Sequence, residues 1–290
     1  MILKSEIGRN AQEWNVPPMT VDKDWVLGHF LCAFFLESDH LQTLMFKGGT
    51  CLRKCYFPGY RFSEDLDFTA INLEYRLTNA MLNSIIQRAT DHSGILFHAE
   101  PVKEMIHKDA QAGDQVRIRF WGANHRKDTP PPADPGRWHD SIKLEITNYE
   151  QVVFEPVHRQ IYHEYSDHLP NSDIRVPCYD LREAMAEKIR ALIQRSYTAP
   201  RDFYDIWMLK DHFNDADWIS INQAFHQKMD FKGYTYHGVD QLINGTSIDH
   251  VTRSWDQSLA HQIPSVNTPN FNVVVEALRT LLTENITRNS

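Results

Sequence analysis

The stretch that decides the fold of this 290-residue chain is Lys47-Gly48-Gly49-Thr50, followed after a short gap by Arg61-Phe62-Ser63-Glu64-Asp65-Leu66-Asp67-Phe68. Glycine has no Cβ, so a Gly-Gly-Thr turn allows backbone N–H groups to approach a phosphate closely. Asp65 and Asp67, two positions apart on a strand, point to one face of a sheet, and their apolar neighbours point into the core. Carboxylates beside a phosphate-binding turn are typical of a divalent-metal site for phosphoryl or nucleotidyl transfer. The alternative is a glycine turn before an ordinary strand with two solvent-facing acids.

The residues around the glycine turn favour the functional interpretation. The apolar segment 43–46 predicts a short strand, and the helical spacing of Cys51, Leu52 and Tyr56 predicts a helix directly after the turn. The turn would then lie at a helix N-terminus, where unpaired N–H groups attract an anion. Alternation places a cation and a hydroxyl, at positions 61 and 63, on the face of the two acids. The predicted nucleotide-binding residues of this region are Lys47, Gly48, Gly49, Thr50, Arg61 and Ser63.

A second predicted strand, at 141–147, alternates cleanly between apolar and polar side chains. Its apolar residues face one side, and Lys143 and Glu145 face the other. If this strand lies beside the first, Glu145 becomes a third carboxylate next to Asp65 and Asp67. Three acids in that arrangement are compatible with a two-metal clamp.

A predicted helix that begins at Asp180 carries a lysine on its apolar stripe. Asp180 with Glu183 three residues later predicts a capping box at the helix start. Lys188 falls where the stripe would normally hold an aliphatic side chain, and an ammonium group there is costly unless it is paired or opens onto a cleft. It either extends along the edge of the stripe to solvent, or reaches triphosphate oxygens or a carboxylate across a cleft.

The next predicted helix, which begins at Pro200, carries Asp202 and Asp205 three residues apart on one face. For Asp202 the first expectation is a capping role in the first helical turn. Asp205 lies within a strongly apolar helix, and pairing with Lys188 or Arg201 would explain it.

Together these motifs resemble a known family. The run Phe-Lys-Gly-Gly-Thr…Arg-Phe-Ser-Glu-Asp-Leu-Asp-Phe, with Glu-Lys-Ile-Arg-Ala-Leu and Arg-Asp-Phe-Tyr-Asp-Ile-Trp-Met-Leu further on, is similar to the AbiEii/AbiGii nucleotidyltransferase toxins of the DNA-polymerase-β-type superfamily. The resemblance extends from about Val21 to the last helix and is specific in the two motif blocks. Such toxins are found in type IV toxin–antitoxin and phage abortive-infection systems.

The resemblance implies roles for individual residues. Gly49 and Thr50 match the Gly-Ser motif, with threonine in place of the usual serine, and Glu145 stands where an aspartate is more typical. The implied catalytic residues are Asp65, Asp67, Lys188 and either Asp202 or Asp205. The implied metal ligands are Asp65, Asp67 and Glu145.

The function that this resemblance implies is metal-dependent transfer of NMP from an NTP to an acceptor, with Mg²⁺ (or Mn²⁺) as the cofactor and the 3′ end of tRNA as the expected acceptor. A winged-helix regulator encoded nearby is the expected antitoxin partner. Three alternatives stay open: an enzyme that nucleotidylates (AMPylates) protein, a non-catalytic nucleotide-binding regulatory component, and a small-molecule transferase of the aminoglycoside-modifying kind. Retention of the acids and of Lys188 argues against the non-catalytic alternative.

Composition limits the class of protein. A formal net charge of −8 speaks against a protein that coats nucleic acid, although the cations of 182–201 and of 117–127 are candidates for a local RNA-binding groove. No segment approaches the roughly 18 consecutive apolar residues of a membrane span, and no charged-then-apolar leader follows Met1. Four cysteines in a chain of this size indicate reduced thiols. We therefore expect a cytoplasmic protein without a membrane partner.

The predicted fold is α+β (mixed): a polymerase-β-like nucleotidyltransferase core with a central mixed sheet and flanking helices, followed by a mostly helical C-terminal region. Further strands are expected at 95–102 and 116–121, and a long helix is expected to end near Gly94. The proline-rich stretch 129–136 must be a loop. Residues 1–175 are assigned to the core domain with its N-terminal helix. Residues 176–290 are assigned to a helical domain that carries Lys188 and the Arg201-Asp202/Asp205 motifs.

Overall fold

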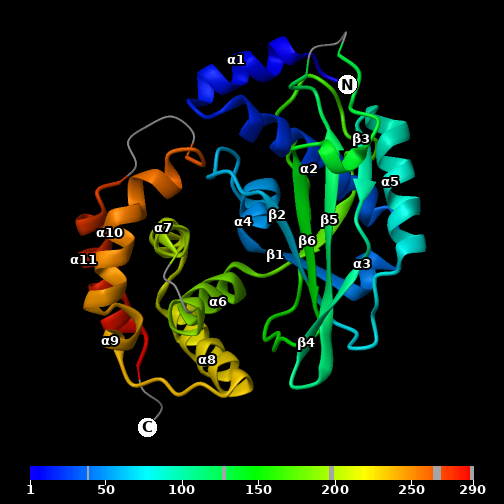
Figure 1. Cartoon of the computed structure of the whole chain (residues 1–290). Coiled ribbons are helices and arrows are strands. Elements are labelled where there is room, and N and C mark those ends of the chain that lie inside the picture. Colours follow the sequence, from blue (N-terminus) through cyan, green and yellow to red (C-terminus); the bar gives the residue numbers. More distant parts are fainter. Residues whose placement is uncertain (38, 126–128, 196–198, 264–268, 288–290) are drawn as a thin grey trace. The chain divides into compact units, whose positions relative to one another are not determined.

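The computed structural model describes residues 1–37, 39–125, 129–195, 199–263 and 269–287 (Figure 1). The described residues form two compact units. Unit 1 comprises residues 1–149, residues 156–178 and a return segment that begins at Gln262. Unit 2 comprises residues 150–155, residues 179–261 and the C-terminal stretch that contains the last helix.

Unit 1 is built around one mixed sheet of eight strands among the described residues: β1 (Leu44–Lys47), β2 (Asp65–Ala70), β3 (Leu96–Ala99), β4 (Lys103–His107), β5 (Ala110–Trp121), β6 (Ser141–Thr147), β7 (Val157–Gln160) and β8 (Arg175–Cys178). The strand order is β3-β5-β6-β2-β1-β8-β7, with β4 paired to β5. β2 runs parallel to β6 and β1 runs parallel to β8, whereas the other neighbours are antiparallel. The two motif-bearing strands, β2 and β6, are therefore direct neighbours.

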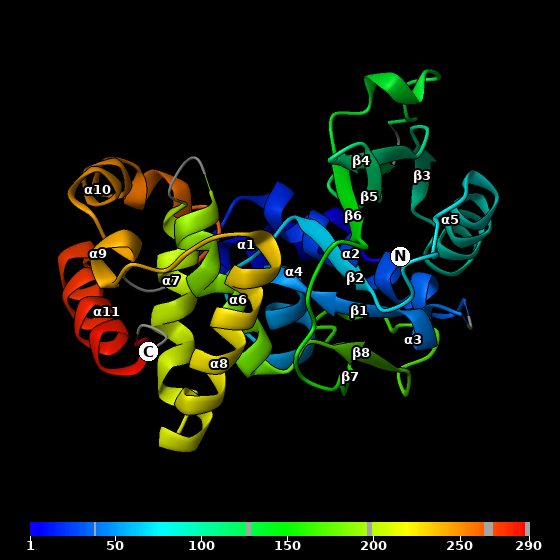
Figure 2. The same cartoon turned by 90° about the horizontal axis from the view of Figure 1, so that it is seen from below.

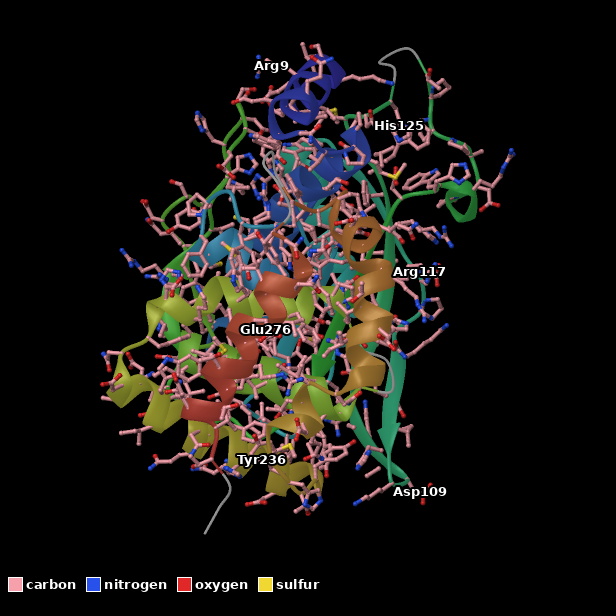
Figure 3. All side chains as sticks on the ribbon, turned by 90° about the vertical axis from the view of Figure 1, so that its left-hand side faces the viewer. Arg9, Asp109, Arg117, His125, Tyr236 and Glu276 are labelled. Atoms are coloured by element: carbon pink, nitrogen blue, oxygen red, sulfur yellow. The ribbon has the colours of Figure 1, made fainter. Side chains whose placement is uncertain are left out.

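One strand prediction is wrong in its extent. The strand expected over 95–102 ends at Ala99 as β3, and β4 begins only at Lys103. Pro101 lies between them and has no N–H to donate to a ladder, so it interrupts the pairing. β4 then turns into β5 through Lys108 and Asp109, both with positive φ, as a tight hairpin turn requires; Figure 3 marks Asp109 at the tip of this hairpin.

Helices flank the sheet of unit 1, and the longest of them, residues 18–35, packs a largely apolar surface against it. The helical segments are α1 (Lys4–Trp14), α2 (Pro18–Phe35), α3 (His40–Thr43), α4 (Gly48–Cys51), the π-helical η1 (Leu52–Tyr56), α5 (Asn79–Ser93) and the 3₁₀ turn η2 (Pro135–Arg137). On α2, Phe34 stacks on Phe68 of β2 with ring centroids 4.7 Å apart. Phe30 packs against Phe97 of β3 with ring centroids 5.7 Å apart. α5 packs against α2 and ends at Gly94, as the sequence predicts.

Unit 2 is helical in its described part (Figure 2). Its helices are α6 (Leu181–Gln194), α7 (Pro200–Leu209), the 3₁₀ turn η3 (Lys210–His212), α8 (Asp215–Lys232), α9 (Val239–Leu242), α10 (Gly245–Leu259) and α11 (Phe271–Asn285). α6 packs against α7 and α8, and α11 packs against the same two helices. A capping box between Asn214 and Asp217 starts α8, and Gly233 in the left-handed conformation ends it.

This architecture confirms the predicted mixed α+β class, with a central mixed sheet, flanking helices and a helical C-terminal part. The proline-rich stretch 129–136 lies outside the strands, as expected, and ends in η2. No helix in the described part of the chain has both the length and the apolarity needed to cross a membrane.

A buried acid in unit 1 makes stability depend on pH. Asp22 of α2 is 1% exposed and accepts a hydrogen bond from the backbone N–H of Ala123 at 2.8 Å, and burial raises the pKa of its carboxyl to about 6. A raised folded-state pKa stabilises the fold at acid pH, and this contribution is lost as the pH rises through about 6.

We therefore expect Asp22→Asn to stabilise the protein above pH 7 by up to about 3 kcal/mol and to give little gain at pH 4, because the parent carboxyl is neutral there. Urea unfolding at both pH values measures the difference, with the exposed Asp91→Asn as the control. An equal effect at both pH values would contradict this assignment.

Candidate functional site

The glycine turn lies directly against one of the two acids of β2. β1 ends at Lys47, which is paired in register with Asp67, and the chain then turns through Gly48 with φ at +79°. A Cβ built on Gly48 would lie 2.5 Å from Oδ2 of Asp67, well inside van der Waals contact. The position therefore requires glycine both for its backbone conformation and for the close approach of the carboxylate.

The other side of the turn is supported by residues of the segment before β2. A Cβ on Gly49 would lie 2.7 Å from Nη2 of Arg61 and 2.9 Å from Oγ of Ser63, so both side chains contact the turn. Thr50 Oγ1 donates a hydrogen bond to the backbone carbonyl of Asp65 at 2.5 Å. Alternation places Arg61 and Ser63 on the face of the two acids, but β2 begins only at Asp65, and Arg61 is buried, at 1% exposure.

The two acids share one face of β2, as predicted, because Leu66 and Phe68 are fully buried on the other face. In the parallel pair β2–β6, Asp67 lies opposite Glu145, so Glu145 is the third carboxylate of this face. Lys143 forms an ion pair with Glu145 at 2.8 Å. The predicted juxtaposition of the three acids across two strands is therefore present.

Cations continue the same face of the sheet away from the acids. Asp65 is in register with Lys143 of β6, which is in register with Arg117 of β5. Residues in register on neighbouring strands point to the same face. Lys143 and Arg117 are exposed, and Figure 3 labels Arg117 on β5. Arg119, two positions further along β5, forms an ion pair with Glu100 at 3.0 Å.

Unit 2 contains the second predicted cluster. Lys188 Nζ of α6 lies 2.7 Å from Oδ2 of Asp205 and 3.0 Å from Oδ1 of Asp202, both on α7. Arg195 adds a second cation at 2.9 Å from Oδ2 of Asp202. The two carboxylates are buried, whereas Lys188 is 14% exposed. Lys188 is thus paired with acids of its own unit, and the predicted pairing of Asp205 with Lys188 is present.

Two predictions for unit 2 are wrong. Asp202 does not cap α7, because Ala199 is the N-cap and the Asp202 carboxylate is engaged by Lys188 and Arg195. The capping box at α6 does not form, although Asp180 caps the helix by accepting from the N–H of residue 182. The Glu183 carboxylate instead accepts from the N–H groups of residues 153 and 154 and pairs with the fully buried Lys228.

The cations near Lys188 are largely neutralised within unit 2. Arg182 pairs with Asp180 at 2.9 Å, and the buried Arg190 pairs with Glu150 at 2.7 Å. Helix α6 therefore offers few uncompensated charges to a nucleic acid. Of the other predicted basic group, Arg126 and Lys127 lie outside the described residues.

One contact beside the glycine turn has no signal in the sequence. The Arg61 guanidinium donates to Oε1 of Gln262 at 3.2 Å, and the backbone N–H of Phe62 donates to the carbonyl of Gln262. The partners are 201 positions apart in the chain, and a lone glutamine in a polar segment predicts nothing. The return segment of unit 1 thus holds the stretch at positions 61 and 62, which leads into the strand that carries the acids.

Comparisons with known proteins show the family and a similar fold. A sequence profile described as nucleotidyl transferase AbiEii toxin of type IV toxin–antitoxin systems matches residues 29–277. Among solved structures, MenT4, a nucleotidyltransferase toxin from Mycobacterium tuberculosis H37Rv, is similar over 97% of this chain and 88% of its own, with a TM-score of 0.63 and 17% sequence identity. No curated protein sequence matches.

Proposed function

The chain belongs to the AbiEii family of nucleotidyltransferase toxins of type IV toxin–antitoxin systems, and on this basis we propose that it transfers NMP from an NTP to the 3′ end of tRNA. The observation that carries the proposal is the contact between the turn at Gly48 and the carboxylate of Asp67. A phosphate bound to the turn would lie beside the acids, where charge develops during transfer.

The chain's own residues would position the reactants. The N–H groups of Gly48, Gly49 and Thr50 donate to the triphosphate. The side chains of Arg61 and Ser63 contact the turn at Gly49 and support its conformation. The acceptor hydroxyl oxygen forms a bond to the α-phosphorus as the bond to pyrophosphate breaks. One of the carboxylates of this face takes up the hydroxyl proton.

The three carboxylates fit a hard divalent cation. Asp65 and Asp67 would hold Mg²⁺ or Mn²⁺, with Glu145 as a further ligand, because carboxylate oxygens are the ligands that these ions prefer. The absence of a side chain at Gly48 leaves the Asp67 carboxylate directly next to the turn. When bound, the metal neutralises charge on the phosphates and lowers the pKa of the acceptor hydroxyl.

The choice of RNA as the acceptor is supported by the row Asp65, Lys143, Arg117 across the sheet. Exposed cations on the face of the acids suit a phosphate backbone that approaches the metal ligands. An antitoxin, which we propose to be a winged-helix regulator, completes the system to which this family belongs.

The test is incubation of the purified protein with Mg²⁺ and each α-labelled NTP, in parallel with small RNA and with whole-cell protein. Label on a tRNA-sized band confirms the proposal and identifies the nucleotide. Label on protein would overturn the RNA acceptor in favour of protein nucleotidylation. Absence of label with nucleotide bound would favour a regulatory component.

Gly48→Ala is expected to lower the transfer rate by about a hundredfold or more, since the new Cβ displaces Asp67 from its position beside the turn. The matched control is Gly59→Ala. Gly59 has nearly the same φ, +77°, but nothing lies within 4 Å of its Cβ position. Both variants lose about 1–2 kcal/mol of stability to the left-handed backbone, and only Gly48→Ala loses activity. Equal activity of the two variants would contradict the site.

Lys188→Ala is expected to raise the KM for NTP or to lower kcat by about a hundredfold, because the role that the family resemblance implies for its ammonium group is to stabilise developing phosphate charge. Arg195→Ala is the control, because it also removes a cation from Asp202 but keeps Lys188. Steady-state kinetics at a temperature where both variants are folded separates the roles. Unchanged kinetics in Lys188→Ala would assign the lysine to structure alone.

A further inference from the structure

A cluster of two histidines and an aspartate in unit 1 shares no residue with the glycine turn or with the three carboxylates of the sheet. His29 is on α2, and His163 and Asp167 are on the connection between β7 and β8. Nε2 of His163 lies 2.8 Å from Oδ1 of Asp167, and Nε2 of His29 lies 3.2 Å from Oδ2 of the same carboxylate. One potential ligand atom from each of the three residues lies within 4.8 Å of the others.

The two imidazole rings of the cluster are largely shielded from solvent, and their Nδ1 atoms are not engaged. The side chains of His29 and His163 are 2% and 7% exposed. In the described part of the chain, the Nδ1 atom of each ring has no hydrogen-bond partner. A partner at Nδ1 would fix which ring nitrogen carries the proton. Without metal, the Asp167 carboxylate keeps the proton of each ring on Nε2; because no partner engages Nδ1, the proton can move there when Nε2 binds a metal.

The carboxylate is oriented from a third side. Indole Nε1 of Trp25, one helical turn before His29, donates to both oxygens of Asp167 at 3.1 and 3.2 Å. Such outer hydrogen bonds fix the orientation of a ligating carboxylate. Burial acts to raise the pKa of Asp167, but the hydrogen bonds from His163 and His29 outweigh it and hold that pKa below its ordinary range, so the group is ionised.

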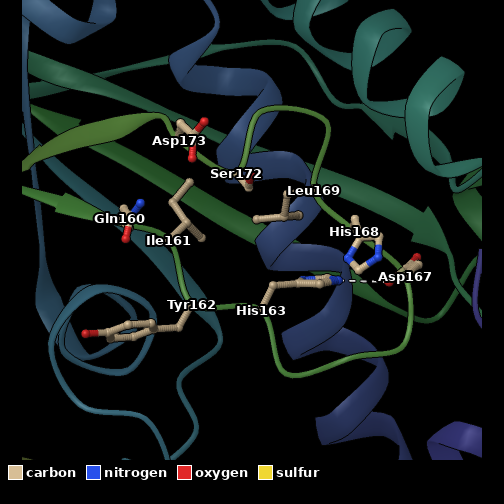
Figure 4. A pocket seen from close by; sticks show the side chains of 9 residues that line it. All are labelled: Gln160, Ile161, Tyr162, His163, Asp167, His168, Leu169, Ser172 and Asp173. Atoms are coloured by element: carbon tan, nitrogen blue, oxygen red, sulfur yellow. Dashed lines mark hydrogen bonds and ion pairs between the residues drawn. The ribbon is translucent and has the colours of Figure 1, made fainter.

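A pocket of about 390 Å³ gives access to the cluster. His163 and Asp167 line it together with His168 and Ser172, as Figure 4 shows. An entry path and space for water are what an ion needs to reach a partly buried ligand set.

We infer that His29, His163 and Asp167 form a binding site for a divalent transition-metal ion of the zinc class. The ion exchanges the two Nε2–H···O hydrogen bonds for Nε2–metal and oxygen–metal bonds. Each imidazole stays neutral: its Nε2 proton is released to solvent, and Nδ1 takes one up. Three protein ligands leave a further position toward the pocket for water.

The chemistry of this site differs from that of the acids on the sheet. Two imidazoles and one carboxylate suit Zn²⁺ or a neighbouring transition metal, whereas Mg²⁺ prefers oxygen ligands alone. The nearby ammonium of Lys54 has its own counter-ion, Asp24, at 2.6 Å. A metal here would join α2 to the β7–β8 connection.

The experiment measures Zn²⁺ binding by calorimetry and Co²⁺ binding by visible absorption, with the metal chlorides as probes. The protein carries Asp65→Asn and Asp67→Asn so that the acids of the sheet do not contribute. We expect one ion per chain and d–d bands of a low-coordinate nitrogen and oxygen site. In that background His163→Gln should bind at least about tenfold more weakly, while His168→Gln, altered in the same pocket, binds as before.

Equal affinity in the His163→Gln and His168→Gln variants, or no binding at micromolar metal, would overturn the site. If His163→Gln does not fold, X-ray absorption of the zinc-loaded parent decides. Imidazole scattering with ligands at about 2.0–2.1 Å supports the assignment, and its absence contradicts it.

Discussion

Asp65→Asn is expected to abolish nucleotidyl transfer and any growth toxicity while leaving the fold intact. The amide keeps the shape of the side chain on β2 but removes the charge that a divalent cation requires. Loss of several kcal/mol of transition-state stabilisation corresponds to a rate about a thousandfold lower. The measurement is incorporation of α-labelled NTP, with circular dichroism to verify folding.

Glu64→Gln is the matched control for this prediction. Glu64 precedes Asp65 directly and pairs with Lys23 at 2.8 Å, so the substitution changes the same charge at the adjacent position. We expect it to retain full transfer activity. Retained toxicity or labelling in Asp65→Asn would contradict the proposed mechanism.

Asp24→Asn is expected to produce the largest loss of stability. Asp24 of α2 is buried and pairs with Arg53 at 2.7 Å and with Lys54 at 2.6 Å, both of which are buried as well. The hydroxyl of Tyr165 donates to the same carboxylate at 2.9 Å. Removing the charge leaves two buried cations without their main counter-ion, which costs about 3–5 kcal/mol.

The pH dependence of Asp24 gives this prediction a second measurement. Burial alone would raise the pKa of the carboxyl, but Arg53 and Lys54 outweigh it and hold the pKa well below the ordinary value of 3.8. A lowered folded-state pKa stabilises the fold above the unfolded pKa, and the contribution is lost as the pH falls below it.

Urea unfolding at pH 7 should therefore show the full loss in Asp24→Asn, and the difference from the parent should shrink toward pH 2. Asp240→Asn is the control, because Asp240 pairs with Arg279 at the surface and is 92% exposed. A loss no larger than that of the control would contradict the role of the buried cluster.

The local geometry of the acids and of the glycine turn is predictable, because it depends on short-range patterns. Alternation gives the face of Asp65 and Asp67 on β2 and the face of Glu145 on β6, because side chains on a strand alternate with a period of two, while the pairing of the two strands is a long-range contact. Gly48 gives the turn, because few other residues accept its left-handed backbone. Such features need no knowledge of distant partners.

The parts that could not be predicted depend on contacts between distant positions. Glu183 has the spacing of a capping box, yet a lysine 45 positions away takes its carboxylate. Asp202 lies in the first turn of α7, where a capping role is expected, yet Lys188 of α6 and Arg195 at the end of α6 engage its carboxylate. The histidine cluster is separated by more than 130 positions along the chain. In each case local propensity competes with a tertiary ion pair or hydrogen bond, and the tertiary contact wins.

The contact of Gln262 with Arg61 and Phe62 has a consequence for synthesis of the protein on the ribosome. The chain leaves unit 1 after Cys178 and returns at Gln262. The residue that supports the segment before β2 is therefore made late in translation. The acids and the glycine turn are made first, but nascent chains shorter than this point lack that support. We expect a chain ending at residue 261 to hold NTP more weakly than the full chain, as equilibrium binding would show. The segment that leads into β2 would then gain its support only after position 262 has been made, well after the acids and the glycine turn.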